Sequence, residues 1–374
     1  MTTSPHPPLR LGILGCANIA RQFARDVRSS RQVRIAAVAS RDAAKAHAFA
    51  TEFGIARAHA SYDALLDDDG LDAVYVPLPN TMHAEWAVRA AQRGRHVLCE
   101  KPLAMGLAEA CTMFDAARQH GVMLLEAYPW WFQPQTATLL ELLRGGAIGR
   151  VRSVQASFGF TLRDPQGTNI RSIAALGGGA LMDAGCYCLS LIRLAIAGMP
   201  QRVQASARSG PTGVDIATTA TLHYADGVTA QLTCAMDLAL HRHAIIVGSD
   251  GVITTEFLNH TSEPGRADGW GYQPSQLRVR RGSGNGPFEA LTSPTGSGFR
   301  FAAEAFAAVV AARDFAAIER AAQASLDIAA TLDAIVASAR SGAPVDVDQA
   351  LAPAQSPRAE SFAARSGTPY CCAR

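Results

Sequence analysis

The segment that most constrains the fold is a short apolar strand leading directly into a turn of small residues. Its sequence is Leu9-Arg10-Leu11-Gly12-Ile13-Leu14-Gly15-Cys16-Ala17-Asn18-Ile19-Ala20. Gly15 permits a sharp turn, Ala17 keeps side-chain bulk away from an approaching ligand, and Ala20 lets the following helix lie close to a sheet. Free N–H groups at the helix start attract phosphate. The spacing matches G-x-G-x-x-G/A with alanine in second place and predicts a dinucleotide site at residues 15–20, although an ordinary strand-to-helix turn has the same pattern.

The first third of the chain alternates short apolar strands with alanine-rich amphipathic helices, which is the rhythm of a parallel sheet. The strands are expected at residues 11–14, 33–39, 73–77, 96–99 and 122–126. Helical patterns occupy residues 42–53 and 83–93, with glycines where helices or turns should end. We therefore expect an α/β fold whose first domain, residues 1–127, is a Rossmann domain with a doubly wound parallel sheet.

The pattern changes after residue 129. A helical segment, residues 133–144, leads into alternating strand-like runs at residues 151–160, 217–224, 229–236 and 244–248, separated by turn signals. These runs predict a C-terminal α+β domain built on a mostly antiparallel open sheet over residues 128–352. Within it, residues 261–298 are rich in Gly, Pro and Ser and are expected to form loops at an edge, whereas residues 299–339 are expected to be helical. Residues 353–374 are expected to form a flexible tail.

Composition excludes several classes of partner. The 374 residues carry 34 basic and 32 acidic side chains and have a net charge of +2 without a basic block, so nucleic acid is not expected to bind. No continuous apolar run approaches the roughly 18 residues that span a bilayer, and the first apolar stretch is already the nucleotide-binding strand. We expect a cytoplasmic protein without a membrane segment. The eight cysteines include no C-x-x-C pair, so neither a disulfide framework nor a metal site is expected.

The end of the second expected strand indicates which cofactor is bound. Rossmann domains that prefer NAD tend to place an acidic group there for the ribose 2′-hydroxyl, whereas this strand ends in Ser40 and Arg41. A hydroxyl and a permanently charged guanidinium suit the 2′-phosphate of NADP. The sequence therefore favours NADP. A solvated surface role for Arg41 stays open, and the adjacent Asp42 keeps NAD possible.

Two further segments, residues 79–83 and 97–102, bring polar residues to the carboxyl ends of expected strands. Open α/β sheets bind ligands at the carboxyl ends of their strands. Pro79, Asn80, His83, Glu100 and Lys101 are therefore candidate cofactor-binding residues. In the alternative interpretation, Glu100 and Lys101 form an ordinary surface ion pair, and His83 simply begins a helix.

A run of three glycines, residues 177–179, precedes an apolar helix. Three successive glycines allow the backbone to approach a ligand or the first domain closely. On the helix that follows, Asp183 and Tyr187 are four residues apart, so both should project from one face. A structural pair, hydrogen-bonded in the core, is the competing interpretation.

Together these segments resemble the glucose-fructose oxidoreductase and inositol dehydrogenase family (Gfo/Idh/MocA). Within that family, the chain is similar to the branch of dimeric dihydrodiol dehydrogenases and NADP-dependent D-xylose dehydrogenases. The matching segments occur in the family's order at residues 12–20, 40–41, 74–83, 100–102, 169–171 and 177–187, and the resemblance spans residues 9–350.

The resemblance implies an NAD(P)-dependent dehydrogenase that transfers hydride between nicotinamide and a carbon of a sugar, polyol or dihydrodiol. It implies that Lys101 lies by the nicotinamide ribose and the reacting oxygen, and that Tyr187 is the acid/base with Lys101 or Asp183 helping it. Which of these three residues exchanges the proton directly stays open. A phenol has a pKa near 10, so Tyr187 needs a nearby ammonium to favour its phenolate. Arg171 and Trp131 are expected by the substrate. Trp131 stands in a segment where many relatives have an arginine.

The resemblance also implies a homodimer or higher homo-oligomer formed through the C-terminal sheet. An alternative function from a different class is a redox sensor that binds NADP on the same fold without turnover. Retention of Lys101, Asp183 and Tyr187 argues against it, because a sensor needs a cofactor pocket but no proton path.

Overall fold

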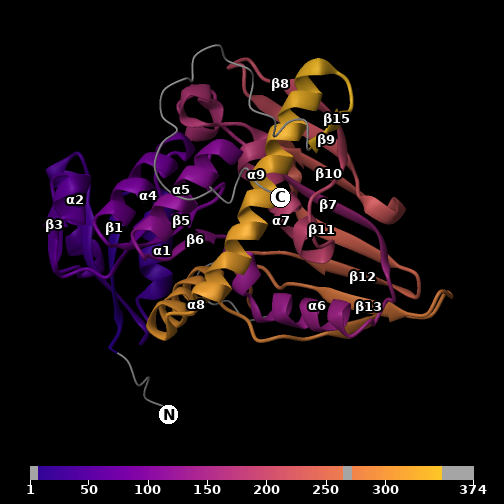
Figure 1. Ribbon diagram of the computed structural model, residues 1–374, viewed down its shortest axis with the longest axis horizontal. Coiled ribbons are helices and arrows are strands. Elements are labelled where there is room, and N and C mark those ends of the chain that lie inside the picture. The colour runs from indigo at the N-terminus through magenta and orange to yellow at the C-terminus, as the bar shows by residue number, and fades with distance from the viewer. Residues whose placement is uncertain (1–6, 264–271, 348–374) are drawn as a thin grey trace.

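Two β-sheets organise the chain (Figure 1). The computed structural model describes residues 7–263 and 272–347, so the expected tail at residues 353–374 lies outside the described residues. One sheet has six strands and is followed in the chain by a second sheet of nine strands.

The first sheet has the order β3-β2-β1-β4-β5-β6, and all of its neighbouring strands are parallel. Its strands are β1 (Leu9–Leu14), β2 (Val33–Ala39), β3 (Arg57–His59), β4 (Ala73–Val76), β5 (His96–Glu100) and β6 (Leu124–Ala127). This is the Rossmann order, in which the chain reverses direction across the sheet between β1 and β4. The doubly wound parallel sheet is confirmed. The three-residue β3 was not expected, because so short a strand leaves no periodic pattern.

Helices cover both faces of this sheet. Helices α1 (Asn18–Val27), α2 (Ala43–Phe53) and α8 (Gly298–Ala312) share one apolar cluster with it, and α3 (Tyr62–Leu66), α4 (His83–Gln92) and α5 (Leu107–Gln119) share the other. The ends of α2 follow from local chemistry. The Asp42 side chain accepts a hydrogen bond from the Lys45 amide at its start, and Gly54 adopts φ +67° at its end. Since α8 returns to the first sheet, a domain boundary near residue 127 stays a prediction.

The second sheet has the order β14-β13-β12-β11-β7-β10-β9-β8-β15. Its strands are β7 (Val151–Thr161), β8 (Arg202–Ser209), β9 (Asp215–His223), β10 (Thr229–Ala235), β11 (Asp237–Gly248), β12 (Gly251–Glu256), β13 (Leu277–Arg281), β14 (Glu289–Leu291) and β15 (Val345–Asp346). Among the described strands of this second sheet, only β7 and β10 pair in parallel, so the mostly antiparallel sheet is confirmed.

The expectation of loops throughout residues 261–298 was wrong for β13 and β14. These two strands form the edge of the second sheet. In β13, Leu277 and Val279 are buried, whereas Arg278 and Arg281 are exposed. The surrounding Gly, Pro and Ser residues form the connections rather than the whole segment.

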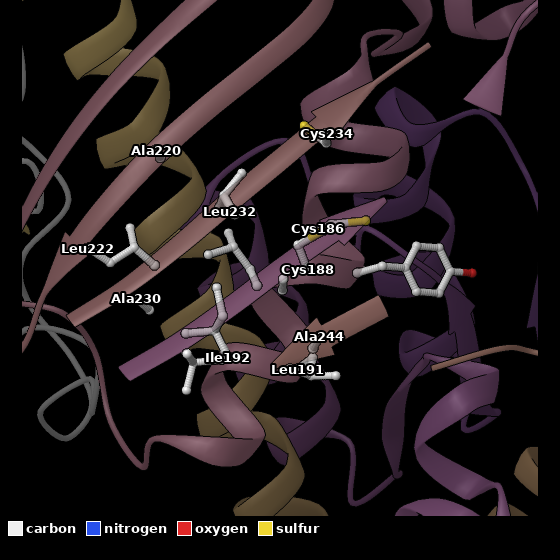
Figure 2. Close-up of a cluster of buried hydrophobic side chains, with 14 of the residues drawn as sticks. Cys186, Cys188, Leu191, Ile192, Ala220, Leu222, Ala230, Leu232, Cys234 and Ala244 are labelled. Atoms are coloured by element: carbon white, nitrogen blue, oxygen red, sulfur yellow. The ribbon is translucent and has the colours of Figure 1, made fainter. Parts of the chain in front are cut away.

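Two helices cover the inner face of the second sheet. Cys186, Cys188, Leu191 and Ile192 of α7 (Cys186–Ala195) lie in one apolar cluster with strand residues such as Leu232 (Figure 2). Helix α9 (Phe315–Ser341) lies along the junction of the two halves (Figure 1) and contributes to the cores of both. Because α7 is packed against the sheet, the residues at its start have defined positions.

One described segment, Ala174–Ala195, is long and apolar enough on average to cross a membrane. The segment is not a continuous apolar run, because glycines and Asp183 interrupt it. Within the structure, 78% of its apolar window is buried. The segment is therefore the core helix α7 with its preceding turns.

Candidate active site

The nucleotide turn lies at the carboxyl end of β1. Gly15 has φ +103°, and a Cβ added there would lie 3.1 Å from Leu78 Cδ2. Ala17 precedes α1 without a side-chain cap, the first turn of α1 has no acidic residue, and Ala20 is completely buried. The remaining residues of the turn are at least partly exposed: Cys16, Asn18 and Ile19. The start of α1 is thus suited to a phosphate group.

Beside Arg41, the Asp42 carboxylate is held at the start of α2. The Ser40 hydroxyl accepts a hydrogen bond from the Asp42 amide at 3.1 Å, and the Asp42 carboxylate caps α2 by accepting from the Lys45 amide at 3.2 Å. The exposed Arg41 guanidinium faces the Tyr62 hydroxyl. Because the carboxylate of Asp42 is engaged by the helix, this edge suits a 2′-phosphate better than a ribose 2′-hydroxyl.

The turn after β4 contacts the glycine run. Pro79 precedes a short 3-10 helix, Asn80–Met82, and Asn80 Nδ2 donates to the Gly177 carbonyl oxygen at 2.8 Å. Gly177 has φ +77°, and a Cβ there would lie 2.8 Å from Asn80 Cβ. A Cβ on Gly178 would instead lie 2.4 Å from the Arg171 carbonyl oxygen. The glycine run therefore approaches the first domain at Gly177, as expected.

His83 fixes the loops on either side of the candidate site. It begins α4, its side chain is completely buried, and its ring nitrogens lie 2.9 Å from the Pro102 carbonyl oxygen and 2.8 Å from that of Leu78. Both nitrogens are thus engaged by backbone. His83 thus joins the backbone after β4 to the backbone that follows Lys101, and its role in cofactor binding stays a prediction.

Glu100 is also a buried residue rather than half of a surface ion pair. Its side chain accepts a hydrogen bond from the Tyr75 hydroxyl at 2.6 Å, which links the ends of β4 and β5. Burial raises the pKa of Glu100 above its ordinary value. Its observed contacts lie inside the protein and hold the strand end from which Lys101 projects, so a direct contact with cofactor stays a prediction.

A charged cluster forms where Lys101 reaches from the first sheet to the second domain. Lys101 Nζ donates to Asp183 Oδ1 at 3.0 Å and to the Asp183 carbonyl oxygen at 2.9 Å. Arg171 Nε donates to Asp183 Oδ2 at 2.7 Å. The side chains of Lys101 and Asp183 are only 11% and 17% exposed. Asp183 lies in a π-helical turn, Leu181–Gly185, before α7, an irregularity that is frequent at functional sites.

The cluster keeps both members of its central ion pair charged. Burial opposes both charges, but Lys101 and Arg171 lower the pKa of Asp183 to about 2. The Asp183 carboxylate in turn outweighs burial and raises the pKa of Lys101. At neutral pH, Lys101 is therefore an ammonium and Asp183 a carboxylate, and neither readily exchanges a proton.

Tyr187 lies beside this cluster and is 5% exposed. Lys101 Nζ lies 4.7 Å from the centroid of its ring, and Arg242 Cζ lies 3.9 Å from it. Asn259 Nδ2 donates a hydrogen bond to its hydroxyl at 2.9 Å. Asp183 and Tyr187 both face Lys101, as their spacing predicts. The ammonium, however, contacts the aromatic ring of Tyr187.

The expected ionisation of Tyr187 needs correction. Lys101 and Arg242 do favour the phenolate, but burial outweighs them and the pKa of Tyr187 is raised. The sequence indicates that a cation is nearby, but the extent to which Tyr187 is buried depends on the tertiary structure. Tyr187 is consequently a neutral phenol at neutral pH.

Trp131 is not brought to the cluster. Its ring packs on Tyr128 with a centroid distance of 4.7 Å, and it lines a separate pocket of about 490 Å³ together with Arg144 and Arg193. Arg171, by contrast, is 39% exposed beside Asp183. The structure therefore places only Arg171, of the two expected substrate residues, next to the candidate catalytic groups.

Two residues beside Tyr187, Arg242 and Asn259, were not expected at the site. Arg242 had a detectable signal, because strand alternation places it on the same face as the buried Ala244 and Ile246. A charged residue at an inward position of an apolar strand indicates a special role. Asn259 follows β12 in a connecting segment and had no such signal. Within residues 7–263 and 272–347, no group of three or more His, Cys, Asp or Glu side chains could hold a metal ion.

Comparison with protein families gives two matches. Residues 9–128 match the oxidoreductase family with an NAD-binding Rossmann fold, and residues 136–254 match the GFO/IDH/MocA C-terminal domain. The two matches account for both the nucleotide turn and the strands that surround Tyr187.

Three individual proteins show the same similarity. D-xylose 1-dehydrogenase (NADP(+)) 2 of Haloferax volcanii is 36% identical over 91% of this chain and 100% of its own length. Trans-1,2-dihydrobenzene-1,2-diol dehydrogenase of Danio rerio is 37% identical over 66% of this chain and 73% of its own. The crystal structure of a 3-ketoreductase from Actinomadura kijaniata, in complex with NADP and TDP-benzene, has a TM-score of 0.77 and 33% identity over 88% of this chain and 98% of its own. With these matches over both halves, the chain belongs to the Gfo/Idh/MocA family of oxidoreductases.

Proposed function

We propose that the protein is an NADP-dependent dehydrogenase that transfers hydride between nicotinamide and a carbon of a sugar, polyol or dihydrodiol. The observation that carries this proposal is the cluster of Lys101, Asp183 and Tyr187, which stands at the carboxyl end of β5. Ligands of open α/β sheets bind at that edge. The D-xylose and dihydrodiol dehydrogenases named above act on substrates of this kind.

The residues at the sheet edge fit NADP. Gly15 and the uncapped start of α1 suit the pyrophosphate, and Arg41 with Ser40 suits the 2′-phosphate, because Asp42 is engaged by α2. When bound, the nicotinamide supplies the hydride acceptor or donor. The 3-ketoreductase neighbour was solved with NADP, which supports the same choice.

Tyr187 is the proposed acid/base. Lys101 and Asp183 hold their charges over the neutral pH range, whereas the neutral phenol of Tyr187 can donate its proton to a substrate carbonyl oxygen. In the opposite direction the phenolate accepts the proton of the substrate hydroxyl. Its raised pKa means that the phenolate fraction, and with it the rate of alcohol oxidation, increases as pH rises toward that pKa.

The experiment that tests the function is a substrate screen. Binding of NADPH is followed by its fluorescence, and aldoses, polyols and dihydrodiols are then offered with NADP while NADPH formation is measured. Turnover on any of these classes supports the proposal. Firm cofactor binding without turnover on any of them would favour the redox sensor instead. A reducing, cytoplasmic location is part of the proposal, and the buried thiols of Cys99, Cys186, Cys188 and Cys234 support it.

Arg41→Ala should weaken NADP binding at least tenfold and leave NAD binding nearly unchanged. Loss of a charge-assisted contact to the 2′-phosphate costs about 1.5 to 3 kcal/mol. Fluorescence titration with both reduced cofactors checks this. Arg34→Ala is the matched control, because Arg34 is an exposed arginine near the opposite end of β2. An equal loss for both cofactors would show that Arg41 does not distinguish them.

We also propose a homodimer through the outer face of β8, β9 and β10. The middle of that face carries uncharged polar side chains, with Arg202 and Arg208 at its ends; the uncharged residues are Gln204, Ser206, Thr219, Thr221, Gln231 and Thr233. Charged residues are depleted at the centres of protein interfaces. Thr219→Arg should convert the dimer to a monomer in light scattering, because a two-fold interface brings the new charge near its own copy. A wild-type monomer, or a Thr219→Arg dimer, would place the interface elsewhere or remove it.

A further inference from the structure

Arg242 is a buried cation enclosed largely by aromatic rings. It projects from β11, is 9% exposed, and its Cζ lies 3.9 Å from the ring centroid of Tyr187, 4.8 Å from that of Phe257 and 4.9 Å from that of Phe158. Among the described residues its Nε atom has no hydrogen-bond partner. Burying a guanidinium in this way costs free energy unless its charge interacts favourably with neighbouring groups.

Two hydrogen bonds through Asn259 connect Arg242 to the hydroxyl of Tyr187. Arg242 Nη2 donates to Asn259 Oδ1 at 3.3 Å, and Asn259 Nδ2 donates to the Tyr187 hydroxyl at 2.9 Å. A guanidinium has donors only, so the Asn259 oxygen must face Arg242 and the Asn259 amino group must face Tyr187. The Tyr187 oxygen is therefore an acceptor in this bond, and its own proton must point elsewhere.

The backbone of Asn259 is held independently of this side-chain bond. Its carbonyl oxygen accepts hydrogen bonds from Gln133 Nε2 at 2.8 Å and from the Gly298 amide at 2.7 Å. The side-chain amide of Asn259 therefore reaches Tyr187 from a segment whose backbone is held in place. Truncating the side chain leaves these two anchoring contacts in place.

We propose that Arg242 and Asn259 are positioning residues, which direct the hydroxyl proton of Tyr187 toward the reacting substrate oxygen and stabilise the phenolate through the guanidinium charge. This inference rests on the proposed function, because it assigns Tyr187 the proton. Burial raises the pKa of Tyr187, and Arg242 and the Asn259 hydrogen bond both act against that rise.

Other charged and titratable groups also surround Tyr187, so their effects must be held constant. They are Lys101 and Glu100 at the end of β5, Asp183 before α7, Arg171, Tyr75 of β4, Tyr128 after β6, and Cys186 and Cys188 of α7. Substituting Arg242 or Asn259 leaves all of them in place. A change in the titration of Tyr187 in such variants can then be assigned to the substituted residue.

The first test measures Tyr187 without any need for turnover. Fluorinated tyrosine, whose phenol is more acidic than that of tyrosine, is incorporated in place of the seven tyrosines, and the Tyr187 fluorine signal is assigned with Tyr187→Phe. We expect Arg242→Met to raise the pKa of this phenol by about one unit or more, since one buried charge has been removed. Asn259→Ala should raise it by less, and Arg242→Lys, which keeps the charge, should leave it closest to the wild type.

The second test is the pH profile of alcohol oxidation. In Arg242→Met the rising limb of kcat/KM should move to higher pH, so that activity falls at least tenfold at neutral pH and recovers in alkali, while the Kd of NADPH changes less than twofold. A purely structural role would lower the rate at every pH without moving the limb. Arg280→Met is the matched control, because Arg280 stacks on Phe288 at 5.0 Å in the same sheet, outside the Tyr187 cluster.

The outcomes separate this inference from the proposed function. An unshifted Tyr187 titration in folded Arg242→Met and Asn259→Ala overturns the inference, even if the wild type turns over sugars with NADP. A shifted titration without wild-type turnover upholds the influence of Arg242 and Asn259 on Tyr187 and overturns the proposed dehydrogenase. If Arg242→Met does not fold, Asn259→Ala and Arg242→Lys decide by the same measurements.

Discussion

Tyr187→Phe is expected to lower turnover by about 100- to 10,000-fold while NADPH still binds with nearly wild-type affinity. The substitution removes one hydroxyl and keeps the ring that packs between Lys101 and Arg242. It therefore removes the transferable proton without emptying the core. Steady-state kinetics with the best substrate of the screen, together with a fluorescence titration of NADPH, checks the expectation.

Tyr224→Phe is the matched control for this variant. Tyr224 is buried to a similar degree, belongs to the same apolar cluster as Tyr187, and lies at the end of β9. It should retain wild-type turnover. Turnover near the wild-type level in Tyr187→Phe would remove the tyrosine as acid/base and return that role to Lys101.

Lys101→Met is expected to cause a loss of turnover of the same order, about 100- to 10,000-fold, because the ammonium orients Asp183 and lies against the ring of Tyr187. Groups that act as a unit give non-additive losses. The double variant Lys101→Met with Tyr187→Phe should therefore be little worse than the poorer single variant. Strictly additive losses would contradict the joint action of the two residues.

Lys101→Met should also change the pH at which the protein unfolds in acid. The pKa of Asp183 is lowered from 3.8 to about 2 in the folded protein, so its pairing contributes stability of the order of 2 kcal/mol above pH 4, which is lost as pH falls toward 2. Without Lys101 the lowering should be smaller. Acid unfolding of Lys101→Met, followed by circular dichroism, should then begin at a higher pH than in Arg280→Met.

The Lys101–Asp183 pair and Tyr187 differ in ionisation because their environments differ. Opposite charges at 3.0 Å keep the ion pair ionised despite burial, whereas the phenol, with cations against its ring and only an amide on its hydroxyl, stays neutral. The ion pair thus has fixed charges, and the neighbouring phenol has a proton that it can transfer. This separation is what an acid/base in a hydride-transfer site requires.

Local patterns in the sequence determined the elements of the fold and several of the residues at the site. Alternating or continuous apolar runs predicted five strands of the first sheet, and Asp42 and Gly54 marked the ends of α2. The need for glycine at residue 15 followed from the turn alone. These features depend on neighbours within a few residues along the chain, which is why they can be inferred from sequence.

Features that depend on distant parts of the chain could not be inferred in the same way. The helical expectation for residues 299–339 did not locate the break between α8 and α9, where Arg313 adopts φ 50° and Asp314 caps the second helix. Strands β13 and β14, at one end of the second sheet, exist because they pair with each other and with β12. Short segments of mixed composition take their conformation from such partners.

The sequence by itself thus determined the parallel sheet and the nucleotide turn, and its family resemblance predicted that Lys101, Asp183 and Tyr187 act together. Only the tertiary structure decided how these groups ionise. It joined Lys101 to Asp183 across 82 positions and brought Arg242 and Asn259 to Tyr187 from the second sheet. The physical reason is that a pKa depends on burial and on charges within a few ångströms. Those distances are set by the packing of the two domains and are not encoded in any local pattern.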